Sequence, residues 1–386
     1  MKVLIVLTYY RPHTSGLTIY AERMGRGLAA RGHDVTVLTS RFDRSLASEE
    51  DRDGVRVVRA PVLCRVSKGV IMPTLGALAT RMVRQHDVVS LHLPQFDAAG
   101  VALRCRLMGR PAVLTYHCDL TLPPGWFNRV VNRAVLTMNG LAGHLADRVV
   151  AYTEDFAHHS PFLRAFEEKI AVIPPPVELP EISDGAVAAF AKMHSLQEGG
   201  PVIGMAARLA AEKGVEVLLK ALPKVVEEYP GARVLFAGQY RDVMGEEAYA
   251  ERLAPLFRQH EDRWKFLGVL RPVQMSAFYP NLDVIVVPSL NSTESFGLVQ
   301  VEAMLYGTPS IASDLPGVRQ PVEQSGMGRV VPIGDNEALA DAIIDVIDRR
   351  EELVRPREEI AALWSTERTV RVYEALFETL RNQGDA

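Results

Sequence analysis

Two carboxylates in one segment could bind a ligand that carries hydroxyl groups. The segment TESFGLVQVEAMLYGTPSIAS (293–313) holds Glu294 in a polar stretch and Glu302 inside a run that is almost wholly apolar from residue 296 to 306. Such a run predicts a helix buried nearly all round, and a glutamate is almost never fully buried unless it is paired. Two hypotheses follow for Glu302: a buried salt bridge to an arginine of the same domain, or a carboxylate that accepts hydrogen bonds from ligand hydroxyls.

The start of this helix is a second candidate binding element. The polar loop LNSTES precedes it, and Ser295 is the predicted N-cap. We expect Phe296, Gly297 and Leu298 to open the helix and to present backbone N–H groups that favour an anion or a hydroxyl. With Glu294 at the mouth, the arrangement suits a ligand that has both phosphate and hydroxyl groups, as a sugar nucleotide has.

Two cations follow the predicted strand PVIGMAA (201–207). Arg208 stands at the carboxyl end of that strand and Lys213 stands just before the next helix. Arginine offers a planar, bidentate grip on phosphate oxygens, and lysine adds a compact charge. The ends of parallel strands are where open α/β sheets bind ligands, so both residues are candidates for a phosphate site. The alternative is two solvated loop cations.

The first turn of the chain argues against a dinucleotide cofactor. A GxGxxG fingerprint would follow the first strand, whereas TYYRPHTSGLTIY contains Gly16 alone. A single glycine that opens a helix still allows backbone N–H groups to approach a phosphate, so Gly16 is a predicted substrate contact. No cofactor is predicted, and no DxD-like carboxylate pair precedes an exposed turn, so no metal site is predicted either.

Short apolar, β-branched runs alternate with helical patterns along the chain. This alternation predicts an α/β protein with parallel strands joined by right-handed crossovers, and the lack of strict polar alternation predicts sheets covered on both faces. The expected strands are 2–8, 34–40, 55–59, 87–93, 112–117, 147–153 and 169–173, then 201–207, 232–238, 264–268, 283–289 and 308–313.

A proline-rich segment, VIPPPVELPEI, separates the two series of strands. We therefore predict two doubly wound, Rossmann-like domains, 1–173 and 183–365, which are joined by a linker at 174–182 and face each other across a ligand cleft. The last helix, 366–381, is amphipathic, and we expect residues 366–386 to cross back and complete the first domain.

The composition is that of a cytoplasmic globular protein. A chain of 386 residues fits two domains, and no apolar run is long enough to span a bilayer. The opening residues MKVLIVLTYYRP lack a small-residue cleavage site, so they predict a strand and not a signal peptide. The cysteines, Cys64, Cys105 and Cys118, form neither a disulfide framework nor a CxxC metal site. Cytoplasmic residence is expected, and no nucleic-acid partner is predicted.

The segment ESFGLVQVE, with the GTP that follows it, resembles the E-x7-E motif of retaining family-4 (group 1) glycosyltransferases of GT-B fold. ARLAAEKG is similar to the family's Arg…Lys-Gly phosphate motif, and YYRPHTSGLTIYAERMGRGLAARGHDVTVLT to its opening strand, glycine loop and helix. The resemblance covers essentially the whole chain, although Ser15-Gly16 stands where Gly-Gly is commoner. It implies transfer of a hexose from a nucleotide diphosphate to an acceptor, with retention at the anomeric carbon and generally without a bound metal.

The resemblance also implies a role for each candidate residue. Arg208 and Lys213 would hold the donor diphosphate, Glu302 the ribose hydroxyls and Glu294 the transferred sugar, in a nucleotide-sugar-binding second domain. The N–H groups of Phe296, Gly297 and Leu298 would hold sugar and phosphate.

In the acceptor-side first domain, His117 at the end of the predicted strand AVLTYH matches the family's active-site histidine, and Asp119 is a candidate for contacting the acceptor. His117 and Glu294 are thus the predicted catalytic residues. A structural role is the alternative for His117. For the whole protein the alternatives are a nucleotide-sugar epimerase of similar fold and an inactive sugar-nucleotide-binding protein.

The charge distribution bears on the acceptor. Residues 1–175 hold 22 Lys+Arg and 15 Asp+Glu, and between Gly54 and Ala146 the only acids are Asp87, Asp97 and Asp119. Such a block attracts anionic partners, or it is a solvated basic face. Trp126 and Phe127, followed by arginines, are a combination that suits a membrane interface. The sequence therefore predicts a lipid-linked or polyanionic glycan acceptor and peripheral contact with an anionic membrane, at its inner face.

Overall fold

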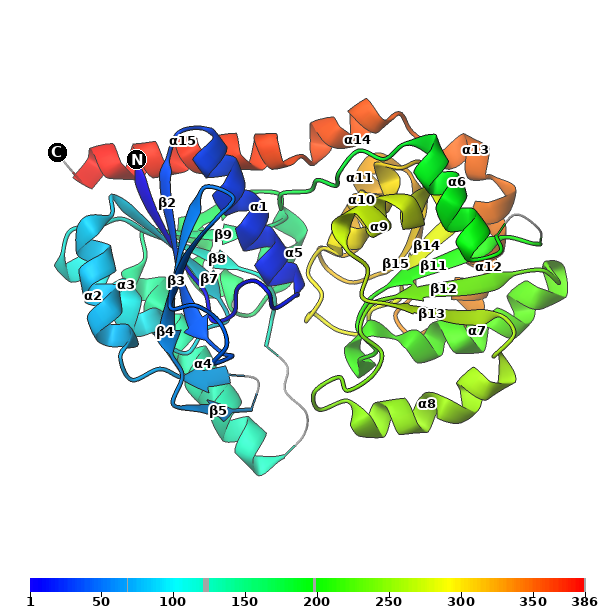
Figure 1. Ribbon diagram of the computed structural model, residues 1–386, viewed down its shortest axis with the longest axis horizontal. Coiled ribbons are helices and arrows are strands. Elements are labelled where there is room, and N and C mark those ends of the chain that lie inside the picture. Colours follow the sequence, from blue (N-terminus) through cyan, green and yellow to red (C-terminus); the bar gives the residue numbers. More distant parts are fainter. Residues whose placement is uncertain (68, 121–124, 197–198, 385–386) are drawn as a thin grey trace. The chain divides into compact units, whose positions relative to one another are not determined.

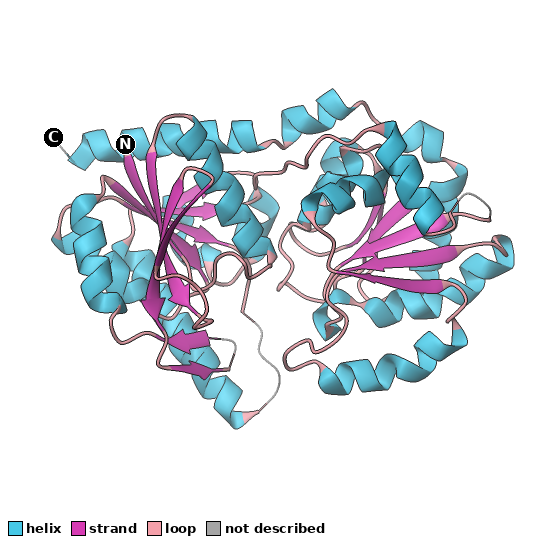
Figure 2. Cartoon of the chain, viewed as in Figure 1, coloured by secondary structure: helices cyan, strands magenta, loops and turns pink. Residues whose placement is uncertain are grey.

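The computed structural model describes residues 1–67, 69–120, 125–196 and 199–384, and it forms two compact units (Figure 1). The first unit comprises Met1–Val177 and the chain from Trp364 onward, and the second comprises Glu178–Leu363. Each unit is a mostly parallel sheet with helices on both faces (Figure 2). The predicted α/β class with two Rossmann-like units is confirmed.

The sheet of the first unit has the strand order β10-β9-β8-β7-β1-β2-β4-β3. Adjacent strands of this sheet are parallel, except for β3 and β4, which are antiparallel. Its central strands are fully buried because helices cover both faces. Its strands are β1 (Lys2–Val6), β2 (Asp34–Arg41), β3 (Glu49–Arg52), β4 (Val55–Pro61), β7 (Val88–Leu93), β8 (Ala112–Tyr116), β9 (Arg148–Ala151) and β10 (Ile170–Val172), and a separate hairpin comprises β5 (Cys64–Val66) and β6 (Gly69–Ile71).

The helices of the first unit include the last helix of the chain. They are α1 (Gly16–Ala30), α2 (Leu75–Gln85), α3 (Ala98–Leu107), α4 (Trp126–Leu145), α5 (Glu154–His159), the 3-10 segment η1 (Leu163–Lys169) and α15 (Thr366–Gly384). Helix α15 packs against α1 so closely that a Cβ at Gly27 would lie 2.6 Å from Val370. The hydroxyls of Tyr20 and Tyr373 are 2.7 Å apart, and Glu374 forms an ion pair with Arg31. The predicted return of the C-terminal helix to the first unit is confirmed.

The sheet of the second unit has the strand order β13-β12-β11-β14-β15-β16, all in parallel. Because β11 is flanked by β12 and β14, the order reverses beside it, which is where doubly wound sheets bind ligands. The strands are β11 (Val202–Ala206), β12 (Arg233–Ala237), β13 (Trp264–Gly268), β14 (Val284–Val287), β15 (Ser310–Ser313) and β16 (Gly328–Val331). The helices are α6 (Asp184–Met193), η2 (Ala211–Lys213), α7 (Val215–Glu228), α8 (Glu247–Gln259), α9 (Pro272–Phe278), η3 (Tyr279–Asn281), α10 (Leu298–Met304), α11 (Gln320–Ser325), α12 (Asn336–Asp348), α13 (Arg350–Leu353) and α14 (Arg357–Leu363).

The proline-rich segment is anchored differently at its two ends. The carbonyl of Pro174 accepts a hydrogen bond from Thr369 in the first unit. The carbonyl of Pro180 accepts hydrogen bonds from Ser276 and Tyr306 in the second unit, each at 2.7 Å. The chain therefore passes from one unit to the other between these two prolines, at the Val177–Glu178 boundary.

Every predicted strand is present, but some elements differ from the sequence prediction. The edge strand β3, the hairpin β5–β6 and the edge strand β16 were not predicted. The helix predicted from Phe296 begins at Leu298, and Gly297 with a φ of 77° occupies the N-cap position without a side-chain cap. The prediction of Ser295 as N-cap is therefore wrong, because the chain enters this helix through a left-handed residue that favours glycine.

Among the helices of the described residues, none combines the length and the hydropathy required to cross a membrane. None of the three cysteines, all within the described residues, forms a disulfide bond.

Candidate functional site

Two loops meet at the carboxyl edge of the second sheet. The loop after β11 turns into α7 through Gly214, which has a φ of 66°. A Cβ on Gly214 would lie 1.9 Å from the carbonyl oxygen of Pro288, directly after β14. The backbone N–H of Leu290 also donates to the carbonyl of Glu212, at 2.9 Å. Glycine at 214 thus allows the loops after β11 and β14 to lie against each other.

This contact brings Lys213 and Glu294 together. The Lys213 Nζ atom lies 2.7 Å from Glu294 Oε2, and the two side chains are 18% and 22% exposed. The other carboxylate oxygen, Oε1, accepts the backbone N–H of Gly297 at 3.0 Å. A cation, a carboxylate and the start of α10 therefore form one continuous polar group. The Gly297 N–H, predicted as a ligand donor, is bonded to Glu294 in this structure.

Arg208 lies two residues beyond the end of β11 and is more exposed than Lys213. Its Nη2 atom lies 3.2 Å from Glu212 Oε1, and its side chain is 44% exposed. The guanidinium therefore retains donors for a further acceptor, since arginine carries five N–H groups. Arg208 and Lys213 lie in the same loop, which places two cations at the edge where ligands of such sheets bind.

Glu302 is buried within α10, as the sequence predicted. The residue is 6% exposed, and one of its partners is the hydroxyl of Tyr279, which donates to Oε2 at 2.7 Å. Tyr279 belongs to η3 and is itself fixed, because Thr308 donates to its backbone carbonyl. A neutral tyrosine hydroxyl leaves the carboxylate its negative charge and further lone pairs, which can accept ligand hydroxyls.

The first unit holds a buried aromatic cluster around His117, which directly follows β8. His117 is 6% exposed, and its Nε2 atom lies 2.8 Å from Nδ1 of His92. The hydroxyl of Tyr152 contacts His117 Nδ1. Tyr20 of α1 packs edge-on against His117, with ring centroids 4.9 Å apart. We call these residues, together with Tyr373, the His117 cluster.

Burial keeps both histidines of this cluster neutral. It lowers the pKa of His92 to about 3, and burial together with the neighbouring His92 lowers the pKa of His117 well below its ordinary value. At neutral pH each ring is therefore a hydrogen-bonding group with one donor nitrogen and one acceptor nitrogen.

These lowered pKa values predict a loss of stability in acid. Above pH 6.5 His92 is neutral in both the folded and the unfolded chain, but between pH 6.5 and about 3 only the unfolded chain binds the proton. The free energy of unfolding should fall by about 1.4 kcal/mol per pH unit for each such histidine as the pH decreases. Urea denaturation of wild type and His92→Asn from pH 7.5 to 4.5 measures this. The free energy of unfolding of the variant should fall less steeply with decreasing pH, by the contribution of one histidine. Parallel curves for the two proteins would contradict the assignment.

The other predicted residues of the first unit lie near loop ends. Gly16 starts α1, and Ser15 caps this helix by accepting the N–H of Thr18 at 3.2 Å. A Cβ on Gly16 would meet no atom within 4 Å, so packing does not require glycine here and the space remains available for a ligand. Asp119 Oδ1 accepts hydrogen bonds from Tyr116 at 3.0 Å and from Ser160 at 2.7 Å. These two bonds fix the position of the Asp119 carboxylate.

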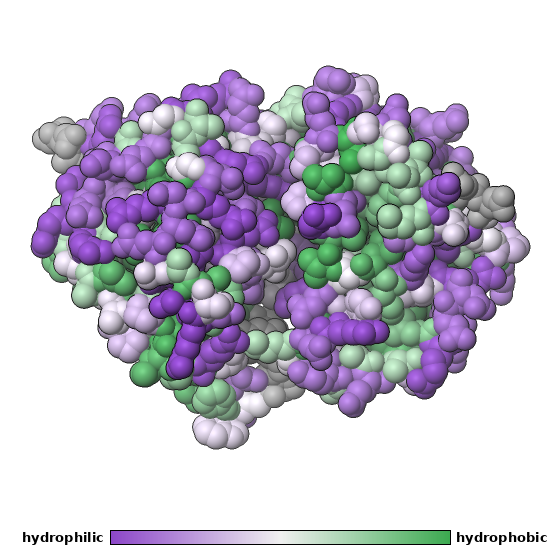
Figure 3. All heavy atoms as spheres, viewed as in Figure 1, coloured by the Kyte–Doolittle hydropathy of each residue, from purple (hydrophilic) through white to green (hydrophobic). Residues whose placement is uncertain are grey.

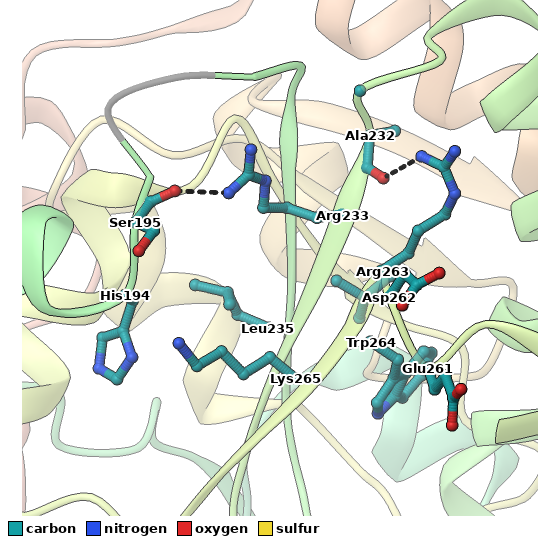
Figure 4. A pocket seen from close by; sticks show the side chains of 12 residues that line it. His194, Ser195, Ala232, Arg233, Leu235, Glu261, Asp262, Arg263, Trp264 and Lys265 are labelled. Carbon is teal, nitrogen blue, oxygen red and sulfur yellow. Dashed lines mark hydrogen bonds between the residues drawn. The ribbon is translucent and has the colours of Figure 1, made fainter. Parts of the chain in front are cut away.

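A pocket of about 520 Å³ lies elsewhere in the second unit (Figure 4). The described residues that line it come from the loop after α6 and from the starts of β12 and β13, hence from the amino edge of the sheet. Arg233 donates to the carbonyl of Ser195 at 2.6 Å and Arg263 to that of Ala232 at 3.3 Å (Figure 4). Since both arginines brace the backbone and the pocket is at the opposite edge from Lys213, we do not assign the pocket to the predicted site.

The sequence did not indicate the residues that contact His117 and Glu302. His92, Tyr152 and Tyr20 surround His117, and Tyr279 bonds Glu302. One signal was available: His92 is a polar residue in the wholly buried strand β7, and such a residue needs a partner. The tyrosines gave no comparable signal, because tyrosine is common in ordinary cores. Among the described residues, no three His, Cys, Asp or Glu side chains are grouped as metal ligands.

Comparison with known families covers both units. Residues 188–362 match the family model described as "Glycosyl transferases group 1", and residues 15–176 match the "Glycosyl transferase 4-like domain". The fold is similar to sucrose-phosphate synthase from Thermosynechococcus elongatus, with a TM-score of 0.78, 21% identity and 98% of each chain covered. It is also similar to Anabaena HepE in complex with UDP, with a TM-score of 0.76, 20% identity, and 98% of this chain and all of that chain covered.

Curated relatives span most of the chain as well. D-inositol 3-phosphate glycosyltransferase of Segniliparus rotundus is 28% identical over 345 residues, with 82% of this chain and 73% of that protein covered. Phosphatidyl-myo-inositol mannosyltransferase of Mycobacterium leprae is 25% identical over 398 residues, with 97% of each covered.

Two Rossmann-like units, the second with a cation–carboxylate group at its carboxyl edge, define a glycosyltransferase of GT-B fold. The chain belongs to the group 1 glycosyltransferases, also called family 4. It is an enzyme that uses a nucleotide-diphosphate-sugar donor.

Proposed function

We propose that the enzyme transfers a hexose, with retention at the anomeric carbon, to a lipid-linked or polyanionic glycan precursor. The observation that carries the donor half of this proposal is the Lys213–Glu294 contact at 2.7 Å, with Arg208 in the same loop. It provides cations for a diphosphate next to a carboxylate for sugar hydroxyls. Glu302, buried in α10, is proposed to accept the ribose hydroxyls.

The residues of this group have complementary roles in the proposed reaction. Negative charge builds on the diphosphate as its bond to the sugar breaks, and fixed cations stabilise that charge more in the transition state than in the ground state. The Lys213 ammonium has three donors, so it can keep Glu294 in place and still bond a phosphate. The N–H groups of Phe296 and Leu298 are proposed to contact sugar and phosphate, while the Gly297 N–H fixes the Glu294 carboxylate.

The first unit is proposed to supply three further contacts. Gly16, whose missing side chain leaves open space, would admit the diphosphate close to the start of α1. His117 would bond a hydroxyl at the reaction centre through its neutral ring, and Asp119, held by Tyr116 and Ser160, would face the acceptor.

A donor screen tests this proposal. Incubation with UDP-, GDP- and ADP-hexoses, followed by NMR, should show slow hydrolysis of one donor with release of the α-anomer from an α-linked donor. Because Arg208 and Lys213 compensate the negative charge of the diphosphate, the rate of donor hydrolysis should be unchanged in EDTA. Inversion of the anomer, or an epimerised nucleotide sugar, would contradict the proposal. Activity lost in EDTA and restored by magnesium would show that the charge assignment is wrong.

The first half of α4 supports the lipid-linked acceptor. Trp126 is 73% and Val130 61% exposed, and Arg129 and Arg133 are exposed on the same turns. The buried residues of this helix all lie in its last two turns. Hydrophobic residues are interspersed with polar ones in this region (Figure 3). Aromatic and basic side chains on one exposed helix suit the interface of an anionic membrane, and the Mycobacterium leprae relative is named for a phosphatidyl-inositol acceptor.

Within the acid-poor block from Gly54 to Ala146, residues 68 and 121–124 lie outside the described residues.

Vesicle sedimentation tests the membrane contact. Trp126→Ser should weaken binding to vesicles that contain phosphatidylglycerol by about ten- to a hundredfold, because burial of a large apolar side chain contributes roughly 1.5–3 kcal/mol. Binding of the wild type should also weaken as salt rises, since each basic residue contributes about 1 kcal/mol near an anionic surface. Met193→Ser is the matched control, because Met193 is 74% exposed but lies in the second unit. Equal sedimentation of wild type with neutral and anionic vesicles would contradict this contact.

A further inference from the structure

A chain of hydrogen-bonding groups runs from His117 into the core of the first unit. His92 Nδ1 lies 2.8 Å from His117 Nε2, and His92 Nε2 lies 3.3 Å from the Oγ atom of Ser90. At the other end, the Tyr152 hydroxyl contacts His117 Nδ1. Both nitrogens of both rings are therefore engaged, and the chain runs from Ser90 through the two histidines to Tyr152.

Neutral rings allow the hydrogens of this chain only two arrangements. A neutral imidazole donates from one nitrogen and accepts at the other, so all three bonds must point the same way. A phenol is an acidic hydroxyl and a good donor, which favours the direction that starts at Tyr152. Tyr152 then donates to His117 Nδ1, His117 donates from Nε2 to His92 Nδ1, and His92 donates from Nε2 to Ser90.

Packing holds the two rings in this geometry. The rings of His92 and His117 are inclined by 30° to each other, with centroids 5.0 Å apart, and Tyr20 lies edge-on to both, with centroids 5.7 and 4.9 Å away. Tyr20 is in turn bonded to Tyr373 of the C-terminal helix, whose hydroxyl lies 2.8 Å from that of Thr115 on β8. Neither imidazole can rotate without displacing these neighbours.

We propose that His92 is a positioning residue for sugar transfer. By accepting the Nε2–H of His117, it keeps the lone pair of His117 on Nδ1, where this atom accepts a hydrogen bond from a substrate hydroxyl. His92 is fully buried and acts only through His117. In this structure the Tyr152 hydroxyl occupies that contact, and a substrate hydroxyl replaces it. The inference rests on the role proposed above for His117.

Substitutions of His92 test the inference, because different side chains can replace its Nδ1 atom, its Nε2 atom or neither. The Oδ1 atom of His92→Asn can replace Nδ1, whereas the amide of His92→Gln reaches the Nε2 position and His92→Leu replaces neither. We expect kcat of the Asn variant to stay within about threefold of wild type. In the Gln and Leu variants kcat should fall about ten- to a hundredfold, with little change in the KM for the donor. Removal of a partner that orients a metal-bound histidine has an effect of this size.

His86→Asn is the matched control. His86 is also buried in the first unit, but its Nδ1 atom contacts the carbonyl of Met82, 2.6 Å away, and not the His117 cluster. This variant should lose stability without losing kcat. If kcat instead follows the melting temperature across all four variants, His92 has only a structural role and the proposal is overturned.

Nitrogen NMR of the imidazoles gives a readout that is independent of activity. Wild type and His92→Asn should show His117 protonated at Nε2 and bare at Nδ1, and His92→Leu should show a mixture of tautomers. A wild-type His117 protonated at Nδ1 would overturn the proposal.

His117→Ala separates this inference from the role proposed for His117. An inactive His117→Ala beside a fully active His92→Leu overturns the positioning role alone, whereas a fully active His117→Ala overturns both. Donor hydrolysis without acceptor identifies the hydroxyl: impaired hydrolysis assigns it to the transferred sugar, and impaired transfer alone assigns it to the acceptor. If His92→Leu impairs neither donor hydrolysis nor sugar transfer, the inference is contradicted.

Discussion

Lys213→Ala should lower kcat about a hundredfold while the protein remains folded. One positioned charge contact to the leaving group contributes on the order of 3 kcal/mol of transition-state stabilisation. The structure adds a second reason for the loss, because Lys213 also holds Glu294 at 2.7 Å. Arg208→Ala should lose a similar factor through the diphosphate alone, since Arg208 bonds Glu212 and not Glu294.

Lys224→Ala is the matched control for Lys213→Ala. Lys224 lies on α7 of the same unit and forms ion pairs with Glu337 and Asp341, so its loss removes a lysine and its ion pairs without touching the loops after β11 and β14. Steady-state kinetics and thermal melting of the three variants give the comparison. Near-normal rates for both Lys213→Ala and Arg208→Ala would place these cations outside the active site.

Glu302→Gln should weaken the binding of free nucleoside diphosphate by about ten- to a hundredfold, and Glu294→Gln should leave it nearly unchanged. A hydrogen bond to a charged group contributes about 1.5–3 kcal/mol, and only Glu302 is proposed to bond the ribose that the free nucleotide retains. Glu294→Gln should instead impair sugar transfer. Calorimetric titration of both variants separates the two roles.

Tyr279→Phe provides the control for Glu302. It removes the hydroxyl that donates to Glu302 Oε2 but keeps the carboxylate, so it should weaken nucleotide binding less than Glu302→Gln. If Glu302 is instead part of a buried ion pair, Glu302→Gln should cost several kcal/mol of stability and leave nucleotide affinity unchanged. That outcome would contradict the ribose assignment.

The sequence predicted those parts of the fold that local patterns determine. Strands buried on both faces are mostly continuous apolar runs, so β1 and β14 could be predicted from the sequence. The edge strand β3, with the sequence EEDR, is charged because exposed edges are protected by charge, and it therefore has no apolar signal. The start of α10 was misplaced because a left-handed glycine, and not a serine side chain, sets the entry to this helix.

The candidate site was predictable residue by residue but not as an arrangement. The types and positions of Lys213 and Glu294 indicated one residue that binds phosphate and another that binds sugar. Their direct contact depends instead on the turn at Gly214 and its approach to Pro288. In the same way, His117 was predicted from its match to the family's active-site histidine. The engagement of both its nitrogens depends on His92 and Tyr152 from other strands, which no local pattern reveals.

We propose that the second unit binds a nucleotide diphosphate through Lys213. Calorimetric titration of UDP, GDP and ADP into the 386-residue chain in EDTA tests this binding, with Lys213→Ala measured in parallel. We predict that one of these nucleotides binds with a stoichiometry of about one and that Lys213→Ala weakens it by about tenfold or more, as expected for the loss of a charged hydrogen bond. Absence of heat for all three at millimolar concentration, or equal affinity in the two proteins, would rule out this role for Lys213.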